Sequence, residues 1–228
     1  MKNSVNIFVA ELIGTFGLVV AATGSIVFDG RMDFSLGPIF VAGMHFLGLT
    51  VLVYAFGKYS MAHFNPAVTI GFLIAGYTKS KLLPLYFSAQ AIGAFLGTFF
   101  VKYVFGDFAN LGANSPNYSY SLPFYFGIEI LATVLLMAVI LLVVHKKSSP
   151  ILAGIAIGGI IGLDVLFFGP ISGASMNPIR SLSPAVVSGV LDNLWMYWVT
   201  PIIGTIIVGF LYRMKFVKSK SREKVSET

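Results

Sequence analysis

Two Asn-Pro dipeptides carry the clearest chemical signal in this sequence. They are Asn65-Pro66, within AHFNPAVT, and Asn177-Pro178, within GASMNPIRS. Asn is a preferred helix N-cap and proline is preset for the first helical turn, so each dipeptide predicts the start of a helix. The side-chain amides of the two asparagines can also donate hydrogen bonds to a passing polar molecule. Each dipeptide therefore predicts a helix N-terminus that presents a hydrogen-bond donor.

Both predicted helices are too short to cross a bilayer. They cover residues 65–75 and 177–187, about half of the roughly 20 residues that a membrane-spanning helix requires. A helix that begins at membrane depth is tolerated only where protein or a water-filled cavity surrounds it. Two such half-helices predict a pore.

Arg180 lies three positions after Asn177. Among the residues of its segment, it has the highest free-energy cost of placement inside a membrane. An arginine at membrane depth is unfavourable unless it reaches water or a partner, so it predicts a functional position. Asp164 has two open interpretations: it pairs with Arg180, or it hydrogen-bonds a loop.

Two acidic residues, Glu11 and Glu129, also lie inside apolar segments. A proton relay is one interpretation of such residues. We favour a loop-anchoring role, because a non-helical loop inside the membrane needs hydrogen-bond acceptors for its backbone amides. His63, just before the first dipeptide, is assigned the same role.

The composition indicates a membrane protein. The chain is 57% hydrophobic and 11% charged, whereas soluble domains carry roughly 25% charged residues. The absence of cysteine excludes disulfides and thiolate metal sites. No metal cluster and no nucleophile with a matched base accompanies the three histidines, so neither an enzyme nor a cofactor is expected. The net charge of +6 does not indicate nucleic acid, because the basic residues collect at the ends of apolar runs and in the tail.

Six apolar runs are long enough to cross a bilayer. The expected spans are residues 7–28, 38–57, 83–105, 123–144, 151–168 and 194–212. The first run is too long for the core of a signal peptide and is expected to remain as a transmembrane helix. The longest polar connection, residues 106–122, is expected to be an exposed loop.

The distribution of basic residues predicts the orientation. Arg31 and Lys102 are the two basic residues expected outside, and twelve others are expected on the cytoplasmic side with both termini. These twelve are Lys2, Lys58, Lys79, Lys81, Lys146, Lys147, Arg213, Lys215, Lys218, Lys220, Arg222 and Lys224. The expected location is a cell membrane, crossed several times, with the lipid bilayer as surroundings.

The two halves of the chain repeat a pattern. FVAELIGT opens the first span and FGIEILAT opens the fourth, and each half holds three spans and one half-helix. An odd number of spans inverts the second repeat relative to the first, so the N-termini of the half-helices meet near the midplane. We expect an all-α membrane protein of six transmembrane helices and two re-entrant half-helices. It forms one domain, residues 1–228, with inverted repeats at about 1–110 and 120–212 and a cytoplasmic tail at 213–228.

With its paired Asn-Pro motifs, Arg180 and the repeated Glu-x-x-x-Thr, the sequence resembles the aquaporins of the major intrinsic protein family, from the Glu11 motif through Trp198. The resemblance implies a passive water channel, open to other small neutral solutes, that excludes protons and ions and assembles as a homotetramer. It places the family's paired motifs at Asn65, Pro66, Ala67, Asn177, Pro178 and Ile179. Isoleucine replaces the usual alanine at the last position, and a small adjustment of helix spacing is expected there.

The same resemblance assigns the selectivity filter by position. It consists of His45, Val165, Ala174 and Arg180. Water-selective members usually place an aromatic residue at the first position and histidine at the second, and this sequence departs from both. If the register is shifted by one residue, Phe46 faces the pore instead.

The departure leaves the solute open. Either His45 restores a narrow polar water filter, or Val165 and Ala174 widen it for glycerol or another small solute. Ser181, with Ala185 and the pair Tyr197-Trp198, resembles the water-channel branch with its orthodox, archaeal and bacterial members. Histidine titrates near neutral pH, so His45 is also a candidate for pH-dependent conduction. An ion-coupled secondary transporter is a third function, since inverted repeats and broken helices occur there too.

Overall fold

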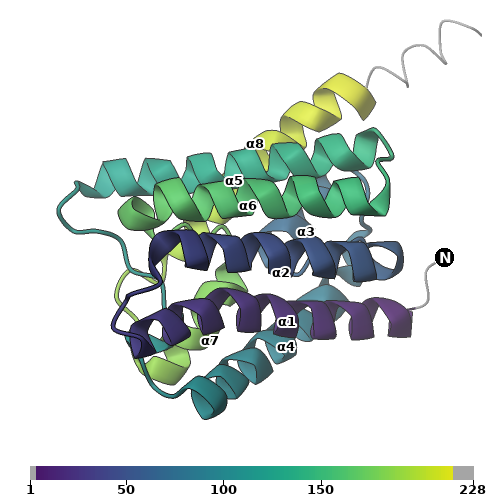
Figure 1. The fold of residues 1–228 in the computed structure, drawn as a ribbon. Coiled ribbons are helices and arrows are strands. Elements are labelled where there is room, and N and C mark those ends of the chain that lie inside the picture. Colours follow the sequence, from purple (N-terminus) through teal and green to yellow (C-terminus); the bar gives the residue numbers. More distant parts are fainter. Residues whose placement is uncertain (1–3, 218–228) are drawn as a thin grey trace, which may run out of the picture.

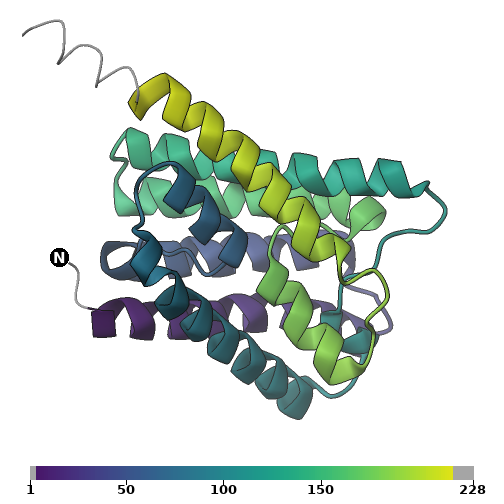
Figure 2. The same ribbon diagram turned by 180° about the vertical axis from the view of Figure 1, so that it is seen from behind.

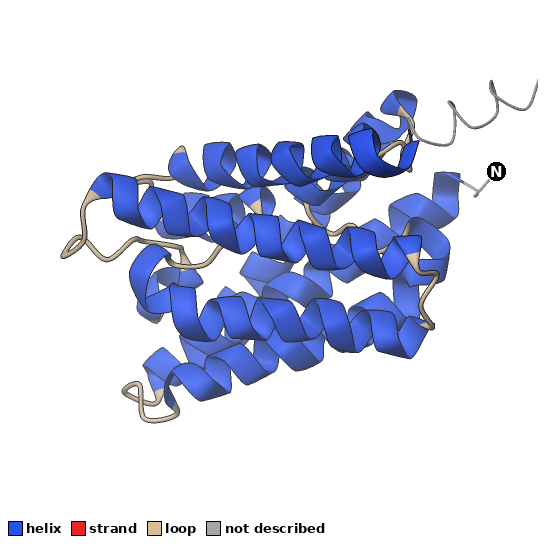
Figure 3. Cartoon of the chain, turned by 90° about the horizontal axis from the view of Figure 1, so that it is seen from above, coloured by secondary structure: helices blue, strands red, loops and turns tan. Residues whose placement is uncertain are grey.

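The computed structural model describes residues 4–217 and is helical throughout that range except for its connections (Figure 3). The six long helices are α1 (Ser4–Arg31), α2 (Gly37–Ser60), α4 (Leu83–Phe105), α5 (Leu122–His145), α6 (Pro150–Ser172) and α8 (Met196–Tyr212). The two short helices are α3 (Pro66–Ile74) and α7 (Pro178–Ser188). Three further turns are η1 (Ser80–Leu82), η2 (Ala109–Gly112) and η3 (Arg213–Val217).

The six predicted spans are confirmed as six helices long and apolar enough to cross a membrane. The predicted span 83–105 coincides with α4, and most of the others extend a few residues further at their ends. The largest difference is in α6, which continues past residue 168 and through Pro170 to Ser172. A single proline removes one intrahelical hydrogen bond, which helices inside membranes tolerate when neighbours pack around them.

The long helices form one bundle from the two halves of the chain (Figure 1). Helix α1 packs against α2 and α4, and α5 packs against α6 and α8. The contact between α2 and α6 joins the halves. Figure 2 shows α8 running obliquely across the back of the bundle.

Glycines permit the closest of these helix contacts. A Cβ atom on Gly93 of α4 would lie 2.3 Å from the carbonyl oxygen of Leu12 in α1. One on Gly158 of α6 would lie 2.5 Å from the carbonyl oxygen of Phe46 in α2. Lipid tails are as apolar as the helix surfaces, so association depends on such close backbone packing.

The two short helices begin where the Asn-Pro dipeptides predicted. Asn65 and Asn177 are the N-caps, both with extended backbone (φ −158° and −144°), and a proline occupies the first turn of each helix. Each short helix packs against long helices of the bundle, α3 against α8 and α7 against α4. The first turns of both half-helices are buried inside the bundle, whereas Val186 near the end of α7 is 50% exposed.

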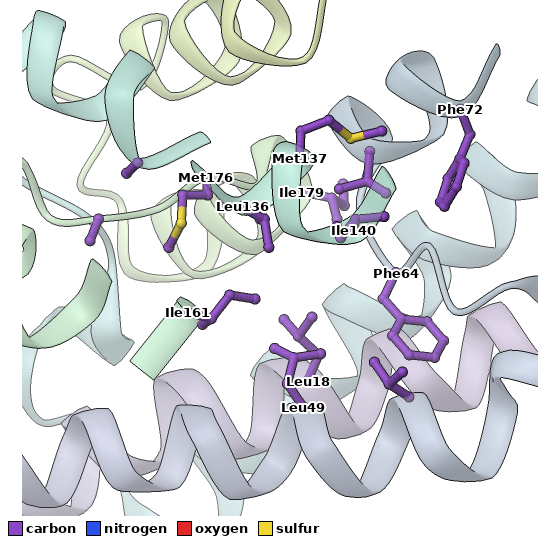
Figure 4. Close-up of a cluster of buried hydrophobic side chains, with 14 of the residues drawn as sticks. Leu18, Leu49, Phe64, Phe72, Leu136, Met137, Ile140, Ile161, Met176 and Ile179 are labelled. Carbon is purple, nitrogen blue, oxygen red and sulfur yellow. The ribbon is translucent and has the colours of Figure 1, made fainter. Parts of the chain in front are cut away.

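A group of apolar side chains from four long helices faces the middle of the bundle (Figure 4). Leu18 comes from α1, Leu49 from α2, Leu136 and Ile140 from α5, and Ile161 from α6. All five also line a cavity inside the bundle. The cluster is therefore both a packing core and the wall of an internal space.

The connection at residues 106–122 is mostly exposed, as expected, but one part of it is buried. It contains η2, and its residues Leu111, Gly112 and Asn114 are buried. Asn110 and Leu111 have left-handed backbone (φ 50° and 55°), which folds this segment back against α1 and α7. The polar residues 117–121 are exposed, whereas Asn114 has hydrogen-bond partners inside the protein.

Most of the basic residues in the described range lie near helix ends on one side of the bundle. Helix α1 begins, and α2, α5 and α8 end, on one side of the bundle (Figure 1). That side carries seven of the twelve basic residues expected together: Lys58, Lys79, Lys81, Lys146, Lys147, Arg213 and Lys215. The other five, Lys2, Lys218, Lys220, Arg222 and Lys224, lie outside the described residues.

The glycine contacts lead to a first prediction. We expect Gly93→Ala to destabilise the protein by about 1–3 kcal/mol, because the added methyl group meets the backbone of α1. Gly127→Ala in α5 is the matched control, since no atom lies within 4 Å of a Cβ there and alanine favours a helix by about 1 kcal/mol. Thermal unfolding of both variants in detergent measures the difference. Equal melting temperatures would show that α1 and α4 separate at little cost.

Candidate functional site

The N-termini of the two short helices are tied together by reciprocal hydrogen bonds. The Nδ2 atom of Asn65 donates to the carbonyl oxygen of Met176 at 2.7 Å, and that of Asn177 donates to the carbonyl oxygen of Phe64 at 2.9 Å. Each Oδ1 atom caps its own helix, accepting from the amide of Ala67 at 2.8 Å in the first. Since an amide nitrogen carries two hydrogens, each asparagine retains one donor.

The loops that lead into the two helices share an unusual backbone. Ala62 and Phe64 have φ values of 52° and 49°, and Ala174 and Met176 have 42° and 54°. These are the third and first positions before the two N-cap asparagines. Left-handed conformations of residues with side chains cost of order 1–3 kcal/mol each and persist only where surrounding contacts impose them. The two loops thus repeat the same constrained geometry.

Glu11 supplies the contacts for the first loop. Its carboxylate accepts from the amide of His63 at 2.9 Å and that of Phe64 at 2.7 Å, and also from the side chain of Gln90 at 2.8 Å. Gly14, one turn along α1, leaves room for the Phe64 ring, which would lie 1.9 Å from a Cβ atom. Helix α1 therefore holds both the backbone and the side chain of this loop.

Glu129 stands at the corresponding place in the second half. Its carboxylate accepts from the amide of Met176 at 2.7 Å and from the hydroxyl of Ser172 at 2.8 Å. It is fully buried, as is Glu11. Both carboxylates accept hydrogen bonds from loop amides and from one polar side chain of a neighbouring helix, and a buried carboxylate requires such partners.

The ring of His63 is stacked between two aromatic rings. Its centroid lies 4.5 Å from that of Phe72 and 4.2 Å from that of Tyr86. Its Nδ1 atom is 3.1 Å from the hydroxyl of Thr69. These contacts fix the histidine between the first loop, α3 and α4.

Two cavities lie in line along the bundle. The inner one has a volume of about 50 Å³ and is bordered by both N-cap asparagines. The outer one has a volume of about 460 Å³ and opens at the end opposite the basic side. His45 and Arg180 are the two residues that border both cavities. They therefore mark the constriction between the cavities.

The other residues assigned to the filter lie on either side of this constriction. Val165 borders the outer cavity and Ala174 the inner one. The ring of His45 is oriented by Nδ1, which lies 2.8 Å from the carbonyl oxygen of Val41. Phe46 borders neither cavity, and its Cβ atom packs against Gly162 of α6. Of these two neighbours, His45 is therefore the one that borders the cavities.

Arg180 is held by two neutral oxygen atoms. Its Nη1 atom donates to the carbonyl oxygen of Gly112 at 3.0 Å and to Oδ1 of Asn114. Asn114 also accepts from the hydroxyl of Ser181 at 2.8 Å and donates to the carbonyl oxygen of Gly173 at 2.8 Å. One side chain therefore connects the arginine to both ends of the second loop.

Asn114 and Gly112 hold the side chain of Arg180, and neither was expected from the sequence. The signal available was an Asn- and Gly-containing connection, which equally describes a solvent-exposed turn. Gly173 belongs to the same arrangement: it has a φ of 88°, and its Cβ would lie 3.0 Å from the Tyr197 hydroxyl and 3.3 Å from Nδ2 of Asn114. A side chain there would displace the group that positions Arg180.

Asp164 does not pair with Arg180, and the hydrogen bonds of the described residues do not connect it to a loop. It is 2% exposed, and its Oδ2 atom has no hydrogen-bond partner within residues 4–217. Arg180 instead reaches the connection before α5, which extends further into the bundle than expected. Both interpretations of Asp164 made from the sequence are therefore wrong for the described part of the chain.

Ile179 is accommodated in the buried cluster beside Met137 (Figure 4). It is 4% exposed. The reciprocal asparagine bonds keep ordinary lengths of 2.7 and 2.9 Å beside it. The larger side chain extends into the apolar core without separating the two N-termini.

The model of one protein family, Major intrinsic protein, matches residues 1–212 of the chain. The chain belongs to this family. "Probable aquaporin NIP7-1" of Arabidopsis thaliana is 38% identical over 220 residues, covering 96% of this chain and 79% of that protein. "Probable aquaporin NIP-type" of Nicotiana alata is 40% identical over 215 residues, covering 90% of this chain and 76% of that protein.

Among solved structures, the X-ray structure of the aquaglyceroporin from Plasmodium falciparum matches with a TM-score of 0.80. It is 26% identical and the match covers 94% of this chain and 97% of that chain. Family membership makes the protein a multi-pass membrane channel of the aquaporin type, which conducts passively and is not an enzyme. Its relatives include proteins named as aquaporins and one named as an aquaglyceroporin.

The position of Asn114 leads to a second prediction. We expect Asn114→Ala to destabilise the protein by on the order of 2 kcal/mol, because the Gly173 carbonyl and Ser181 hydroxyl lose their partner in a buried site. Asn117→Ala in the same connection is the control, since its side chain is exposed and donates a longer bond of 3.3 Å to Pro170. Thermal unfolding and osmotic water permeability measure the two variants. If both behave alike, Asn114 is not what positions Arg180.

Proposed function

We propose that the protein conducts water, and other small neutral solutes, passively while excluding protons and ions. It acts as one channel domain, with inverted repeats at about residues 1–110 and 120–212, and assembles as a homotetramer in the cell membrane. Both termini face the cytoplasm. The gathering of basic residues on the side where α1 begins and α8 ends supports this orientation.

The observation that carries the proposal is the meeting of two helix N-termini at one cavity. Each N-terminus places about half a positive charge there, and Asn65 and Asn177 each have one amide hydrogen left for a solute. A water molecule whose oxygen accepts from these donors does not accept from the next water in the file. Proton transfer along the file is therefore interrupted, and the same positive field opposes cations.

The apolar walls of the inner cavity sharpen this selection. Leu18, Leu49, Ile140 and Ile161 offer no hydrogen bonds, so the amides of the asparagine pair face a largely apolar wall. The desolvation free energy of a small neutral molecule in such a passage is low. That of an ion is high, because nothing replaces its hydration shell.

The constriction adds a second selection step. Arg180 and His45 form its polar side, and the guanidinium repels cations while donating hydrogen bonds to neutral solutes. Val165 and Ala174 form small apolar surfaces on either side of it. A water molecule therefore meets the guanidinium donors of Arg180 and the remaining ring nitrogen of His45 at the constriction, with apolar side chains before and after it.

A second candidate function, glycerol or small-solute conduction, is favoured by the size of the outer cavity. Its volume of about 460 Å³ is far above that of a few water molecules, and Ile26, Val41 and Val165 give it an apolar wall. A polyol fits such a space with carbon atoms against that wall and hydroxyls toward Arg180. The resemblance to an aquaglyceroporin structure also supports this alternative.

Stopped-flow light scattering of proteoliposomes tests both functions. With a sorbitol gradient, we expect faster shrinkage than in protein-free liposomes, because the pore conducts water. With a glycerol gradient, re-swelling identifies the second function and its absence identifies a water-selective pore. Fluxes that require a proton or sodium gradient would instead indicate coupled transport and contradict the channel.

The charge of Arg180 leads to a further prediction. At an effective dielectric constant of about 20, a cation about 4 Å from the guanidinium is opposed by about 4 kcal/mol. Replacing both filter residues, Arg180→Val with His45→Ala, is therefore expected to raise proton conductance by about tenfold or more. A pH-sensitive dye inside the proteoliposomes measures it. Arg31→Val is the control, because it removes a charge from an exposed helix end outside the passage. Unchanged proton conductance in the double variant would assign the whole barrier to the half-helices.

A further inference from the structure

A groove between α5 and α8 lies outside the channel described above. It has a volume of about 340 Å³ and is walled by aliphatic side chains, among them Ala138, Leu142, Val208 and Leu211. Leu142 is 57% exposed and Leu211 58% exposed, so the groove is open to the surroundings of the bundle. Both helices are membrane spans. The groove therefore opens toward the hydrocarbon of the bilayer.

One end of the groove is polar. His145 ends α5 and its Nδ1 atom lies 2.9 Å from the Tyr212 hydroxyl at the end of α8. The His145 ring also contacts that of Phe216 at 4.3 Å between centroids. Lys215, exposed on the turn after α8, borders the groove at this end. The space therefore passes from aliphatic walls to a cationic rim within one groove.

Within residues 4–217, the basic side chains around this rim form no salt bridge. Lys146 and Lys147 follow α5 directly, and Arg213 lies on the same turn as Lys215. The one salt bridge of the described residues joins Lys102 and Asp107, at the other ends of the helices.

The acidic side chains of the described residues are also distant from the rim. Of those in residues 4–217, Glu11, Glu129 and Asp164 are buried inside the bundle, and the remaining four lie toward the opposite ends of the helices. The rim thus lacks a protein anion among the described residues and is complementary to an external one.

The chemistry of the groove selects its occupant. A ligand must carry a long aliphatic part for the walls and an anion at the depth where the helices leave the membrane. Residues 218–228 of this chain do not fit, because Val225 is their one apolar side chain. A phospholipid with an acidic headgroup meets both requirements, since basic groups near the bilayer surface attract such headgroups by about 1 kcal/mol each.

We propose that this groove binds one acidic phospholipid, with an acyl chain between α5 and α8 and the headgroup phosphate at Lys215. The rings of His145 and Tyr212 close the polar end, and Lys146 adds to the local charge. The site is independent of the solute that the channel conducts.

Native mass spectrometry of the detergent-purified protein tests the proposal with dioleoyl phosphatidylglycerol and dioleoyl phosphatidylcholine. These lipids share their acyl chains and differ in charge. We expect wild-type protein to retain the acidic lipid at least tenfold more strongly. Lys215→Gln removes the charge, and Ala138→Phe fills the groove at an exposed position. Both variants are expected to lose this preference.

Two controls separate the groove from its surroundings. Lys58→Gln makes the same charge change at the end of α2, and Val104→Phe adds the same ring at an exposed position of α4. Both are expected to bind lipid as the wild type does. All four variants should keep wild-type water permeability, which shows that they are folded.

Three results would overturn the proposal. Equal retention of the two lipids would contradict the proposed contact between the headgroup and Lys215. If Lys58→Gln and Lys215→Gln lose the preference for the acidic lipid equally, the lipid is attracted to the basic side as a whole and not to the groove. If Ala138→Phe alters the oligomeric state while lipid retention is unchanged, the groove is occupied by a second copy of the chain.

Discussion

The structure depends on one constraint: non-helical backbone inside a membrane must find its hydrogen bonds within the protein. The two loops that precede Asn65 and Asn177 are such backbone, and both adopt strained left-handed conformations. Glu11 and Glu129 accept hydrogen bonds from the amides of these loops. Each asparagine donates one hydrogen bond to a carbonyl of the opposite loop. These hydrogen bonds hold the loops in place before any solute is bound.

This division of hydrogen bonds also defines what the channel offers a solute. An asparagine amide that caps its own helix through oxygen and binds the opposite loop through one hydrogen retains a single donor. Loss of either cross-loop bond would release a second donor and leave a carbonyl without its partner in an apolar surrounding, at a cost of roughly 1–3 kcal/mol. The same bonds therefore fix the helix ends and limit the polar groups that face the passage.

Much of this arrangement was predictable from the sequence because its signals are local. Proline and asparagine encode a helix start, and a glutamate in an apolar segment encodes a buried acceptor. Asn114 was not predictable in the same way, because its role depends on Arg180, which is 66 positions away. The two interpretations of Asp164 were wrong for a related reason, because its position in the sequence does not say which distant groups its side chain reaches. Long-range contacts of single polar side chains leave no periodic pattern to detect.

The choice of neutral partners for Arg180 has an electrostatic consequence. Had Asp164 paired with the guanidinium, the two charges would largely have cancelled at the constriction. Gly112 and Asn114 instead offer a carbonyl and an amide oxygen, which satisfy the donors and orient the group without neutralising it. Within the described residues Arg180 has no salt bridge. Its full positive charge therefore acts where the two cavities meet, and the connection that positions it is part of the proposed barrier to cations.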